Sequence, residues 1–486
     1  MRVRVSCAGI PRTIDSHSHT IMALIQVETS PKPLDTTANP SVSAGVSPAG
    51  IALPKVALAP MVNSIPAAQV KVDNKMSPAQ LMSALQNAVI AGNIPQIALH
   101  MITYATNILT SDIHIEPMEK FVRTRFRVDG VLRLIIEYPL NIHPAVISRL
   151  KIMSGLKIDE QRVPQDGRLQ IVTGDGKSLD LRVSTLPTVN GEKIVMRIQD
   201  KSKKIPELTE LGIQGENLKK MERFLKLPNG VVLVTGPTGS GKTNTLYSVL
   251  RCLNQVGVNI MTFEDPVEYQ MDGLNQSQMK PEIKYDFASG LRTALRQDPN
   301  IIMVGEIRDQ ETIDIAIRAA LTGHLVLSTI HTNSAVGTLT RITDMGVPGF
   351  MIASAIRGII AQRLVRKVCS ECKEMYTPEA PIQAEIRKEL EGVSEKHFDK
   401  KLLENIQLAK GKGCDKCGHL GTRGRLGVFE IMEMDRELGA LLIKNAPDTT
   451  LMDQAQKSGM VTLKQDGFIK AMRGEIPIEE VYRIVA

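Results

Sequence analysis

The sequence predicts an α/β protein. A small α+β domain precedes a doubly wound, mostly parallel sheet, which is followed by a cysteine-rich module and a helical C-terminal region. Short apolar runs alternate with helical patterns from residue 231 to residue 330, which is typical of a parallel sheet. Apolar and polar residues alternate over 112–135, which is typical of antiparallel strands. Two Cys-x-x-Cys pairs, at 369–372 and 414–417, favour metal binding over disulfides.

Length and composition indicate a globular protein with more than one domain. At 486 residues the chain is too long for a single compact core. Its 59 basic and 52 acidic residues are interspersed and give a net charge of +7. An ordinary solvated surface explains this charge, with a nucleic acid or an acidic lipid surface as alternative partners. No apolar run approaches the roughly 18 residues that cross a bilayer, and the apolar segment 21–25 is too short for a signal peptide, so we expect a cytoplasmic protein.

The first two segments of the chain differ in composition. Residues 1–76 are rich in Pro, Ala and Ser and show no helical or strand period, so we expect a disordered tail. Residues 77–199 are expected to form the α+β domain, in which Asp129-Gly130 makes a two-residue turn between strands. Its predicted helices cover 78–91, 94–109 and 143–155, and its predicted strands cover 112–116, 122–128, 131–135, 168–172, 178–184 and 193–198.

A charged linker at 200–207 leads to the sheet domain at 208–368. Its predicted strands cover 231–234, 259–263, 301–304 and 325–330, and its predicted helices cover 243–255, 286–296 and 309–322. Isoleucine and leucine at near-helical spacing predict a further helix over 348–368. The cysteine module covers 369–420 and contains a predicted helical insert at 383–403. Residues 421–486 are expected to be helical, with two or three short amphipathic helices after residue 436.

The first strand of the sheet domain leads into a phosphate-binding loop. Gly236-Pro237-Thr238-Gly239-Ser240-Gly241-Lys242-Thr243 has the residues of a P-loop in the required order of strand, loop and helix. Its glycines allow backbone N–H groups to close around phosphate oxygens, Lys242 reaches the terminal phosphates, and the Thr243 hydroxyl can hold Mg²⁺. A bound nucleotide such as ATP is therefore expected.

Carboxylates follow two strands of the same sheet. Glu264 and Glu268 come after the strand 259–263, and Glu306 comes after the strand 301–304. Parallel strands end at one edge of a sheet, so these groups should lie near the P-loop. Because Gly305 stands where a metal-binding Asp often sits, Glu306 is assigned to Mg²⁺, directly or through water. Glu264 and Glu268 then remain candidates for orienting the attacking water, with helix caps or salt bridges as the alternative.

Two histidines bracket the fourth strand of the sheet domain. His324 precedes this strand and His331 follows it, so both are candidates for sensing the terminal phosphate through hydrogen bonds. The alternative is that each is an ordinary core or surface histidine.

The cysteine pairs predict zinc. Cys369, Cys372, Cys414 and Cys417 can supply four thiolates to a closed, structural Zn²⁺ site, with a redox dithiol as the alternative. Their two pairs are separated by 41 residues (373–413), and the site can form if the ends of this insert meet.

Taken together, these motifs resemble the type II secretion and type IV pilus assembly ATPases, hexameric motors at the bacterial inner membrane. The resemblance covers about residues 77–486 and rests on segments 111–116 and 125–130, the P-loop, the acidic segment 264–268, the segment 296–309, the histidine segment 322–333 and the cysteine module. It implies a RecA-like P-loop NTPase domain. It also implies that N-terminal-domain arginines, here Arg125, Arg127 and Arg133, act on ATP in the ring, and that Arg292 and Arg296 lie near the nucleotide or a subunit interface.

The expected function is that of a hexameric cytoplasmic ATPase, peripheral at the inner membrane, which drives type IV pilus assembly through a membrane platform protein. The zinc module favours assembly over pilus retraction, and the short N-terminus suggests a type IVb or conjugative thin pilus. Type II protein secretion is the alternative within the family. A nucleic-acid motor or DNA-binding zinc protein is an alternative of another class, but with 3% aromatic residues and no basic cluster at the cysteines we expect no nucleic acid partner. A scaffold with a purely structural nucleotide site is a third reading.

Overall fold

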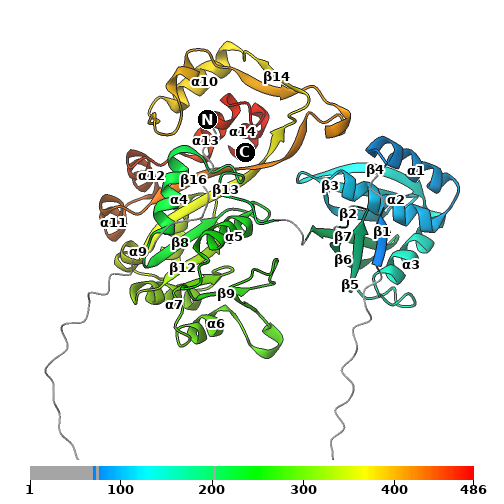
Figure 1. The fold of residues 1–486 in the computed structure, drawn as a ribbon, viewed down its shortest axis with the longest axis horizontal. Helices are drawn as coiled ribbons and strands as arrows, with labels where there is room; N and C mark the ends of the chain where they lie inside the picture. Colours follow the sequence, from blue (N-terminus) through cyan, green and yellow to red (C-terminus); the bar gives the residue numbers. More distant parts are fainter. Residues whose placement is uncertain (1–68, 73–75, 175, 177, 201–203, 486) are drawn as a thin grey trace, which may run out of the picture. The chain divides into compact units, whose positions relative to one another are not determined.

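The computed structural model describes residues 69–72, 76–174, 176, 178–200 and 204–485 (Figure 1). Strand β1 (Gln69–Val72) pairs in parallel with β5 (Gln165–Thr173), so the segment predicted as a tail over 1–76 contains a strand near its end. The rest of that predicted tail, apart from Met76, lies outside the described residues.

The N-terminal domain is a sheet covered by helices on one face. Its strands lie in the order β1-β5-β6-β7-β2-β3-β4. The other strands are β2 (Thr110–Pro117), β3 (Phe121–Val128), β4 (Val131–Pro139), β6 (Ser178–Thr188) and β7 (Gly191–Asp200). The helices are α1 (Pro78–Ile90), α2 (Ile94–Asn107) and α3 (His143–Met153), with a short 3₁₀ turn at Leu140–Ile142. Alternate residues of the strands, such as Ile113 and Phe126, join these helices in one buried core.

The first predicted helix of this domain and the predicted turn at Asp129-Gly130 are both present. Ser77 caps α1 in a capping box with Gln80. Asp129 (φ 49°) and Gly130 (φ 86°) form the two-residue turn between β3 and β4, where both positions need a positive φ.

The larger body is built on a second sheet, ordered β10-β9-β11-β12-β8-β13-β16 (Figure 1). Its strands are β8 (Gly230–Thr235), β9 (Ile260–Glu264), β10 (Asn275–Gln278), β11 (Ile301–Val304), β12 (Leu325–Ile330), β13 (Ile356–Val368) and β16 (Thr422–Glu433). All neighbours pair in parallel except β13 and β16, which pair antiparallel. The predicted mostly parallel α/β fold is therefore confirmed.

Helices cover both faces of this sheet, as in a doubly wound fold. Val231 and Leu233 of β8 point into a core shared with α6 (Phe287–Ala294), α7 (Gln310–Leu321), α8 (Ala335–Asp344) and α9 (Gly349–Ala355). Val232 and Val234 point into the opposite core, which they share with α4 (Gly215–Leu225) and α5 (Lys242–Leu253). Because both faces of β8 are buried, the strand is a continuous apolar run.

The helix predicted over 348–368 is present only over Gly349–Ala355, and the rest of the prediction is wrong. Helix α9 ends at Ala355, and the following residues form the 13-residue strand β13. This strand lies between β8 and β16, so residues on both of its faces are buried and the alternation that identifies a strand is lost. Ile356, Ile359 and Ile360, which contributed to the apparent helical stripe, are β-branched residues of this central strand, whereas Ile352 lies in α9.

The C-terminal part also differs from the prediction. The insert predicted as helical over 383–403 is helical only in α10 (Ala380–Leu390) and a 3₁₀ turn at Lys400–Leu403, and it is flanked by the paired strands β14 (Lys373–Tyr376) and β15 (Leu408–Gly411). Strand β16 occupies residues predicted to be helical. Four helices follow: α11 (Arg436–Ile443), α12 (Asp448–Lys457), α13 (Leu463–Met472) and α14 (Ile478–Val485). Two further 3₁₀ turns lie at Pro281–Ile283 and Asp415–Cys417.

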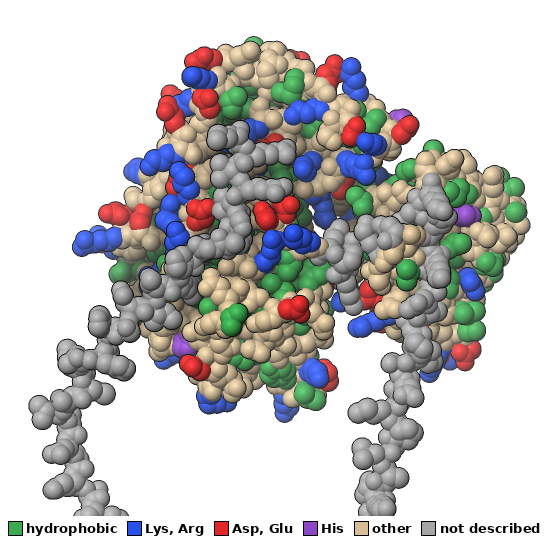
Figure 2. All heavy atoms as spheres, viewed as in Figure 1, with side chains coloured by type: hydrophobic (Ala, Val, Ile, Leu, Met, Phe, Trp, Pro, Cys, Tyr) green, Lys and Arg blue, Asp and Glu red, His purple; other side chains and the backbone are tan. Residues whose placement is uncertain are grey.

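Within the described residues, no helix has the length and apolar character needed to cross a bilayer. On the face shown in Figure 2, basic and acidic side chains are interspersed over the larger body. Outside the parts drawn in grey, this view shows no extended patch of one sign, in agreement with the mixed charge pattern of the sequence.

Candidate functional site

The P-loop connects β8 to α5. Gly241, with φ 89°, is the N-cap residue of α5, so Lys242 begins the helix. The Lys242 Nζ atom folds back over the loop and donates to the carbonyl oxygens of Gly236 (2.8 Å) and Pro237 (3.3 Å). Burial lowers the pKa of Lys242, and the nearby Glu306 carboxylate opposes this shift. A lysine at the start of a helix and next to a glycine-rich loop is suited to bind phosphate.

Gln362 of β13 braces this loop, and the sequence analysis missed it. The side chain is 2% exposed, its Nε2 donates to the Ser240 carbonyl (2.7 Å), and its Oε1 accepts from Thr245 Oγ1 (2.8 Å). Gly236 must be glycine, because a Cβ there would lie 2.5 Å from the Gln362 carbonyl oxygen. The assignment of 348–368 to a helix hid this contact, since only a strand beside β8 brings Gln362 to the loop.

Glu306 and His331 meet at the same edge of the sheet. Glu306 follows β11, and its Oε2 lies 3.3 Å from His331 Nε2, which follows β12. Arg308 forms an ion pair with the other carboxylate oxygen of Glu306. Thr329 fixes this edge by donating to the Gly305 carbonyl (2.8 Å). The predicted grouping of Glu306 and His331 near Lys242 is therefore present.

His324 lies at the opposite edge. It precedes β12, and its carbonyl accepts from the Gly230 N–H group at the start of β8, whereas the P-loop follows the end of β8. A six-residue strand is about 20 Å long, so His324 cannot reach a phosphate at the P-loop of the same subunit. Its Nδ1 lies 2.9 Å from the Ala319 carbonyl oxygen, as in a satisfied structural histidine. Within one subunit, His324 therefore lies too far from the P-loop to contact a phosphate held there, whereas His331 lies at the sheet edge that carries the P-loop.

The two glutamates of the acidic segment differ in environment. Glu264 is 3% exposed and accepts hydrogen bonds from Thr262 Oγ1 (2.5 Å), Gln276 Nε2 (3.1 Å) and the Tyr247 hydroxyl. Glu268 is partly exposed on the segment that follows β9. A buried carboxylate with three donors is suited to hold structure, whereas a partly exposed one can approach water.

Two of the three N-terminal-domain arginines that were expected to act on ATP, Arg125 and Arg127, form ion pairs within that domain. Arg125 donates to both carboxylate oxygens of Glu116 (2.8 and 3.0 Å). Burial would raise the pKa of Glu116, but hydrogen bonds from Arg125 and Lys193 lower it to about 2. Arg127 lies 3.5 Å from Asp112 and donates to the Gly130 carbonyl (2.9 Å).

Three further arginines of this sheet are Arg133, which was predicted as a site residue, and Arg168 and Arg182, which were not. Arg133 is paired with Phe126, whereas Arg125 and Arg127 precede and follow Phe126 along β3, so Arg133 lies on the other face from them.

Strand register places one row of residues side by side on the charged face: Arg168, Arg182, Arg197, Asp112 and Arg127. Among the described residues, neither Arg168 nor Arg182 forms an ion pair. The residues of this row lie on different strands and are far apart in the sequence, so they form no sequence motif. Only the pairing of the strands shows that they are neighbours.

Arg292 lies on α6, and Arg296 lies just after this helix. Both are exposed, and Arg292 forms an ion pair with Glu311 in the first turn of α7. Arg296 donates to the Arg292 carbonyl (3.3 Å). Their predicted role at a nucleotide or a subunit interface stays a prediction.

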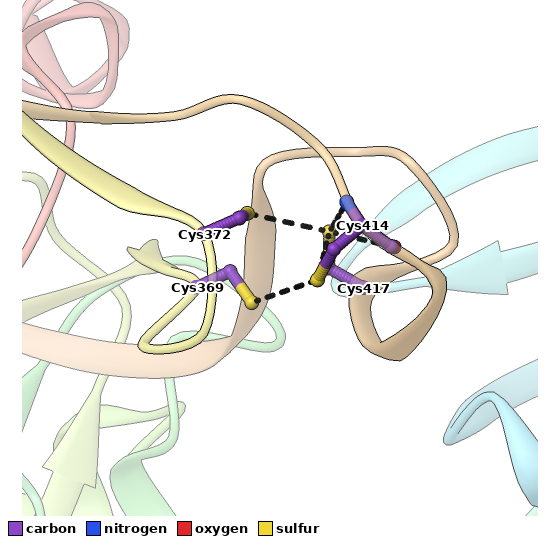
Figure 3. Close-up of side chains that lie close together, drawn as sticks. All are labelled: Cys369, Cys372, Cys414 and Cys417. Carbon is purple, nitrogen blue, oxygen red and sulfur yellow. Dashed lines mark hydrogen bonds between the residues drawn. The ribbon is translucent and has the colours of Figure 1, made fainter.

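The four predicted cysteines converge (Figure 3). The Sγ–Sγ distances are 3.9 Å for Cys369–Cys414, 3.9 Å for Cys372–Cys417 and 3.7 Å for Cys414–Cys417. Tetrahedral zinc with Zn–S bonds of about 2.3 Å requires sulfurs about 3.8 Å apart, so the cluster fits a four-thiolate zinc site.

Backbone N–H groups support the same sulfurs. Gly413 donates to Cys372 Sγ (3.3 Å), and Cys414 and Gly421 donate to Cys417 Sγ (3.2 and 3.3 Å). Such donors stabilise thiolate ligands. The paired strands β14 and β15 bring the ends of the 41-residue insert together, as the predicted site requires.

Comparisons with known proteins place these features in a family context. A family model described as type II/IV secretion system protein matches residues 88–483. The type II secretion system ATPase E of Vibrio cholerae is 45% identical over 374 residues, which cover 77% of this chain and 72% of that protein. The type IV pilus assembly ATPase PilB of Pseudomonas aeruginosa is 45% identical over 375 residues, which cover 77% of this chain and 64% of that protein.

Solved structures give the same fold. The ATPase DotB of Legionella pneumophila aligns with a TM-score of 0.56 at 22% identity, over 79% of this chain and 94% of that chain. The pilus retraction motor PilT with bound ADP aligns with a TM-score of 0.50 at 26% identity, over 79% of this chain and 95% of that chain.

Proposed function

The chain belongs to the type II/IV secretion system protein family and is an ATPase, and we propose that it is a hexameric motor that drives type IV pilus assembly at the bacterial inner membrane. The observation that carries the motor assignment is the P-loop with Lys242, Glu306 and His331 at one sheet edge. A type IVb or conjugative thin pilus is the finer form of this proposal. Type II secretion is the second candidate, because the secretion ATPase and the pilus ATPase are equally similar, at 45% identity.

The residues around the P-loop divide the hydrolytic task. Lys242 binds the terminal phosphates, and Thr243 and Glu306 offer the hard oxygen ligands that suit Mg²⁺ together with phosphate oxygens. His331 is supported as the phosphate sensor by its contact with Glu306. Mg²⁺, when bound, neutralises charge that develops on the phosphates during transfer.

Glu268 is the carboxylate that orients the attacking water. Its partner candidate, Glu264, is buried and already accepts three hydrogen bonds, so it has little capacity to bind and turn a water molecule. Glu268 is closer to solvent and follows the same strand. Hydrolysis therefore uses Glu268 directly and Glu264 only through the structure it holds.

Arginines of the N-terminal domain complete the site in a neighbouring subunit of the ring. Arg125 and Arg127 are engaged by Glu116 and Asp112, which favours Arg168 and Arg182 as the cations free to approach phosphate. Arg133 remains a candidate from the other face of the sheet. Arg292 and Arg296 are proposed to lie at the contact between subunits.

The cysteine cluster is proposed to bind structural zinc. Four thiolates leave no open position for a substrate. Zinc would fasten the end of β13 to the loop after β15 and so fix the insert to the larger body.

A deletion strain tests the biological assignment. Loss of surface pili with normal protein secretion, restored by the wild-type gene and not by Lys242→Ala, is the expected result. Loss of secretion with normal pili would favour type II secretion instead.

Light scattering with a non-hydrolysable ATP analogue tests whether the protein forms a hexamer. Cell fractionation with and without the other machinery proteins tests whether it is recruited to the membrane.

A further inference from the structure

The hydroxyl group of Tyr247 joins the P-loop helix to the acidic segment. Tyr247 lies on α5, one turn after Lys242 and Thr243, and is 1% exposed. Its hydroxyl donates to Glu264 Oε2. The hydroxyl oxygen of Tyr247 also accepts hydrogen bonds from the backbone N–H groups of Glu268 (3.3 Å) and Tyr269 (3.5 Å). One side chain therefore contacts the end of β9 and the backbone of the residue assigned to orient water.

The hydrogen bond between the Tyr247 hydroxyl and the Glu264 carboxylate belongs to a rigid network. Burial, and then the hydrogen bond to Glu264, raise the pKa of Tyr247, so the hydroxyl keeps its proton at neutral pH. Glu264 is also held by Thr262 and Gln276, which leaves its carboxylate little freedom to turn. Buried networks in which each member is satisfied are rigid, and loss of one member leaves costly unpaired groups.

Gln276 extends the same network to the other end of the acidic segment. Its Nε2 donates to Glu264 (3.1 Å) and to the Tyr269 carbonyl (2.9 Å), and its Oε1 accepts from the Met271 N–H group (2.7 Å). The backbone that carries Glu268 is thus held through Glu264 and Tyr247 on one side and through Gln276 on the other.

We propose that Tyr247 is a positioning residue that sets the placement of Glu268 relative to the P-loop. This inference rests on the proposed role of Glu268 in orienting water. Helix α5 carries Lys242 and Thr243 in its first turn and Tyr247 in its second, so the phosphate ligands and the anchor of the Glu268 segment belong to one rigid element. Misplacement of a catalytic group by about 1 Å costs on the order of 100-fold in rate.

Tyr247→Phe removes only the hydroxyl and keeps the ring in the core. We expect kcat for ATP hydrolysis to fall about 10- to 100-fold while KM for ATP stays within about twofold, because the P-loop contacts are unchanged. Tyr285→Phe is the matched control, since that hydroxyl lies 2.7 Å from Ser277 Oγ and makes no contact with the acidic segment among the described residues. The control should keep both constants. Binding of a fluorescent ATP analogue to each variant verifies that the nucleotide site is folded.

A parallel Glu268→Gln variant separates this inference from the proposed function. If Glu268→Gln hydrolyses ATP normally, the assignment of Glu268 is wrong. If Glu268→Gln is inactive but Tyr247→Phe has wild-type kcat, only the positioning role is overturned. An equal loss of kcat and of ATP affinity in Tyr247→Phe would also overturn it, because a general structural defect acts on both.

The double variant Tyr247→Phe/Glu264→Gln adds a test of the network. If both residues act through the same placement of Glu268, the double variant should be no slower than the slower single variant by more than about twofold. Effects that multiply would show two independent roles and contradict the proposal.

Discussion

At the scale of single residues, burial distinguishes side chains that the sequence motif treats as equal candidates for a role. Glu264 and Glu268 both follow β9, yet one is buried in a hydrogen-bonded network and the other is partly exposed. A motif gives the spacing of residues along the chain but not their burial. The sequence therefore could not show which of the two glutamates is the better candidate for orienting water. The separation of His324 and His331 was predictable, because residues before and after a buried parallel strand must lie at opposite edges of the sheet.

The two histidines should therefore differ in their effect on hydrolysis. His331→Ala removes the group next to Glu306, and we expect kcat to fall at least tenfold, within the usual range for a group that positions or senses phosphate. His324→Ala removes a contact to the Ala319 carbonyl far from the P-loop and should retain most of the activity of one site. Steady-state phosphate release measures both. Equal losses would show that His324 acts on a nucleotide held elsewhere, as in a neighbouring subunit.

Gln362 gives a prediction for nucleotide binding. Gln362→Leu removes the donor to Ser240 and the acceptor for Thr245, so the P-loop loses its brace on the β13 side. Loss of two buried hydrogen bonds of about 1 kcal/mol each should weaken ATP binding roughly tenfold or more. Titration with a fluorescent ATP analogue measures the affinity. Gln456→Leu, at an exposed position of α12, is the control and should bind as wild type.

At the scale of elements, the sequence predicted those whose pattern is local. Helices α1 to α3, the turn at Asp129-Gly130 and the four strands 231–234, 259–263, 301–304 and 325–330 all occur near their predicted bounds. The strands that were not predicted are β1, β10, β13, β14, β15 and β16, and the helices that were not predicted are α4 and α8. Of these, β13 shows the reason most clearly. A central strand buried on both faces has no period of two, and its pairing partner β16 is more than 50 residues away, after the insert. Only the folded sheet supplies that partner.

Packing of α4 against β16 gives a pH-dependent prediction. Lys220 is 3% exposed and donates to the carbonyls of Ile431 and Gly459, and burial lowers its pKa to about 8. The unfolded chain then binds more protons than the folded chain between pH about 8 and about 10.5, so the free energy of unfolding should rise over this range. Below pH 8 both states are protonated and the contribution is constant.

Urea unfolding at several pH values tests this linkage. The rise in stability above pH 8 should shrink in Lys220→Met, because the titrating group is gone. Lys219→Met is the matched control, since Lys219 is 65% exposed and lies on the neighbouring position of α4. If Lys220→Met shows the same rise as wild type, another group is responsible for it.

Metal removal probes the cysteine module. The purified protein should contain about one zinc per chain, and Cys417→Ser should lose it, because three thiolates and a hydroxyl bind zinc more weakly. Protease should then cut the insert between β14 and β15 faster, while the P-loop still binds nucleotide. Zinc content by mass spectrometry and limited proteolysis measure this. Full zinc content in Cys417→Ser would contradict the four-thiolate site.

At the scale of the whole molecule, the N-terminal domain and the sheet domain divide the proposed work. The sheet domain holds the P-loop, Glu306 and His331, and the N-terminal domain presents a row of arginines on one sheet face. A motor in which arginines from one subunit complete the site of another depends on assembly, so turnover per chain should depend on protein concentration. The interspersed surface charge gives no reason to expect a response to DNA.

The most direct test of this account is phosphate release with Mg-ATP over a range of protein concentrations, with and without single- and double-stranded DNA. We expect that turnover per chain rises as rings form, that DNA does not change it, and that Lys242→Ala abolishes it while zinc stays bound. Turnover that is independent of assembly, or stimulation of many-fold by DNA, would contradict the assignment as a secretion or pilus motor and would favour a nucleic-acid motor.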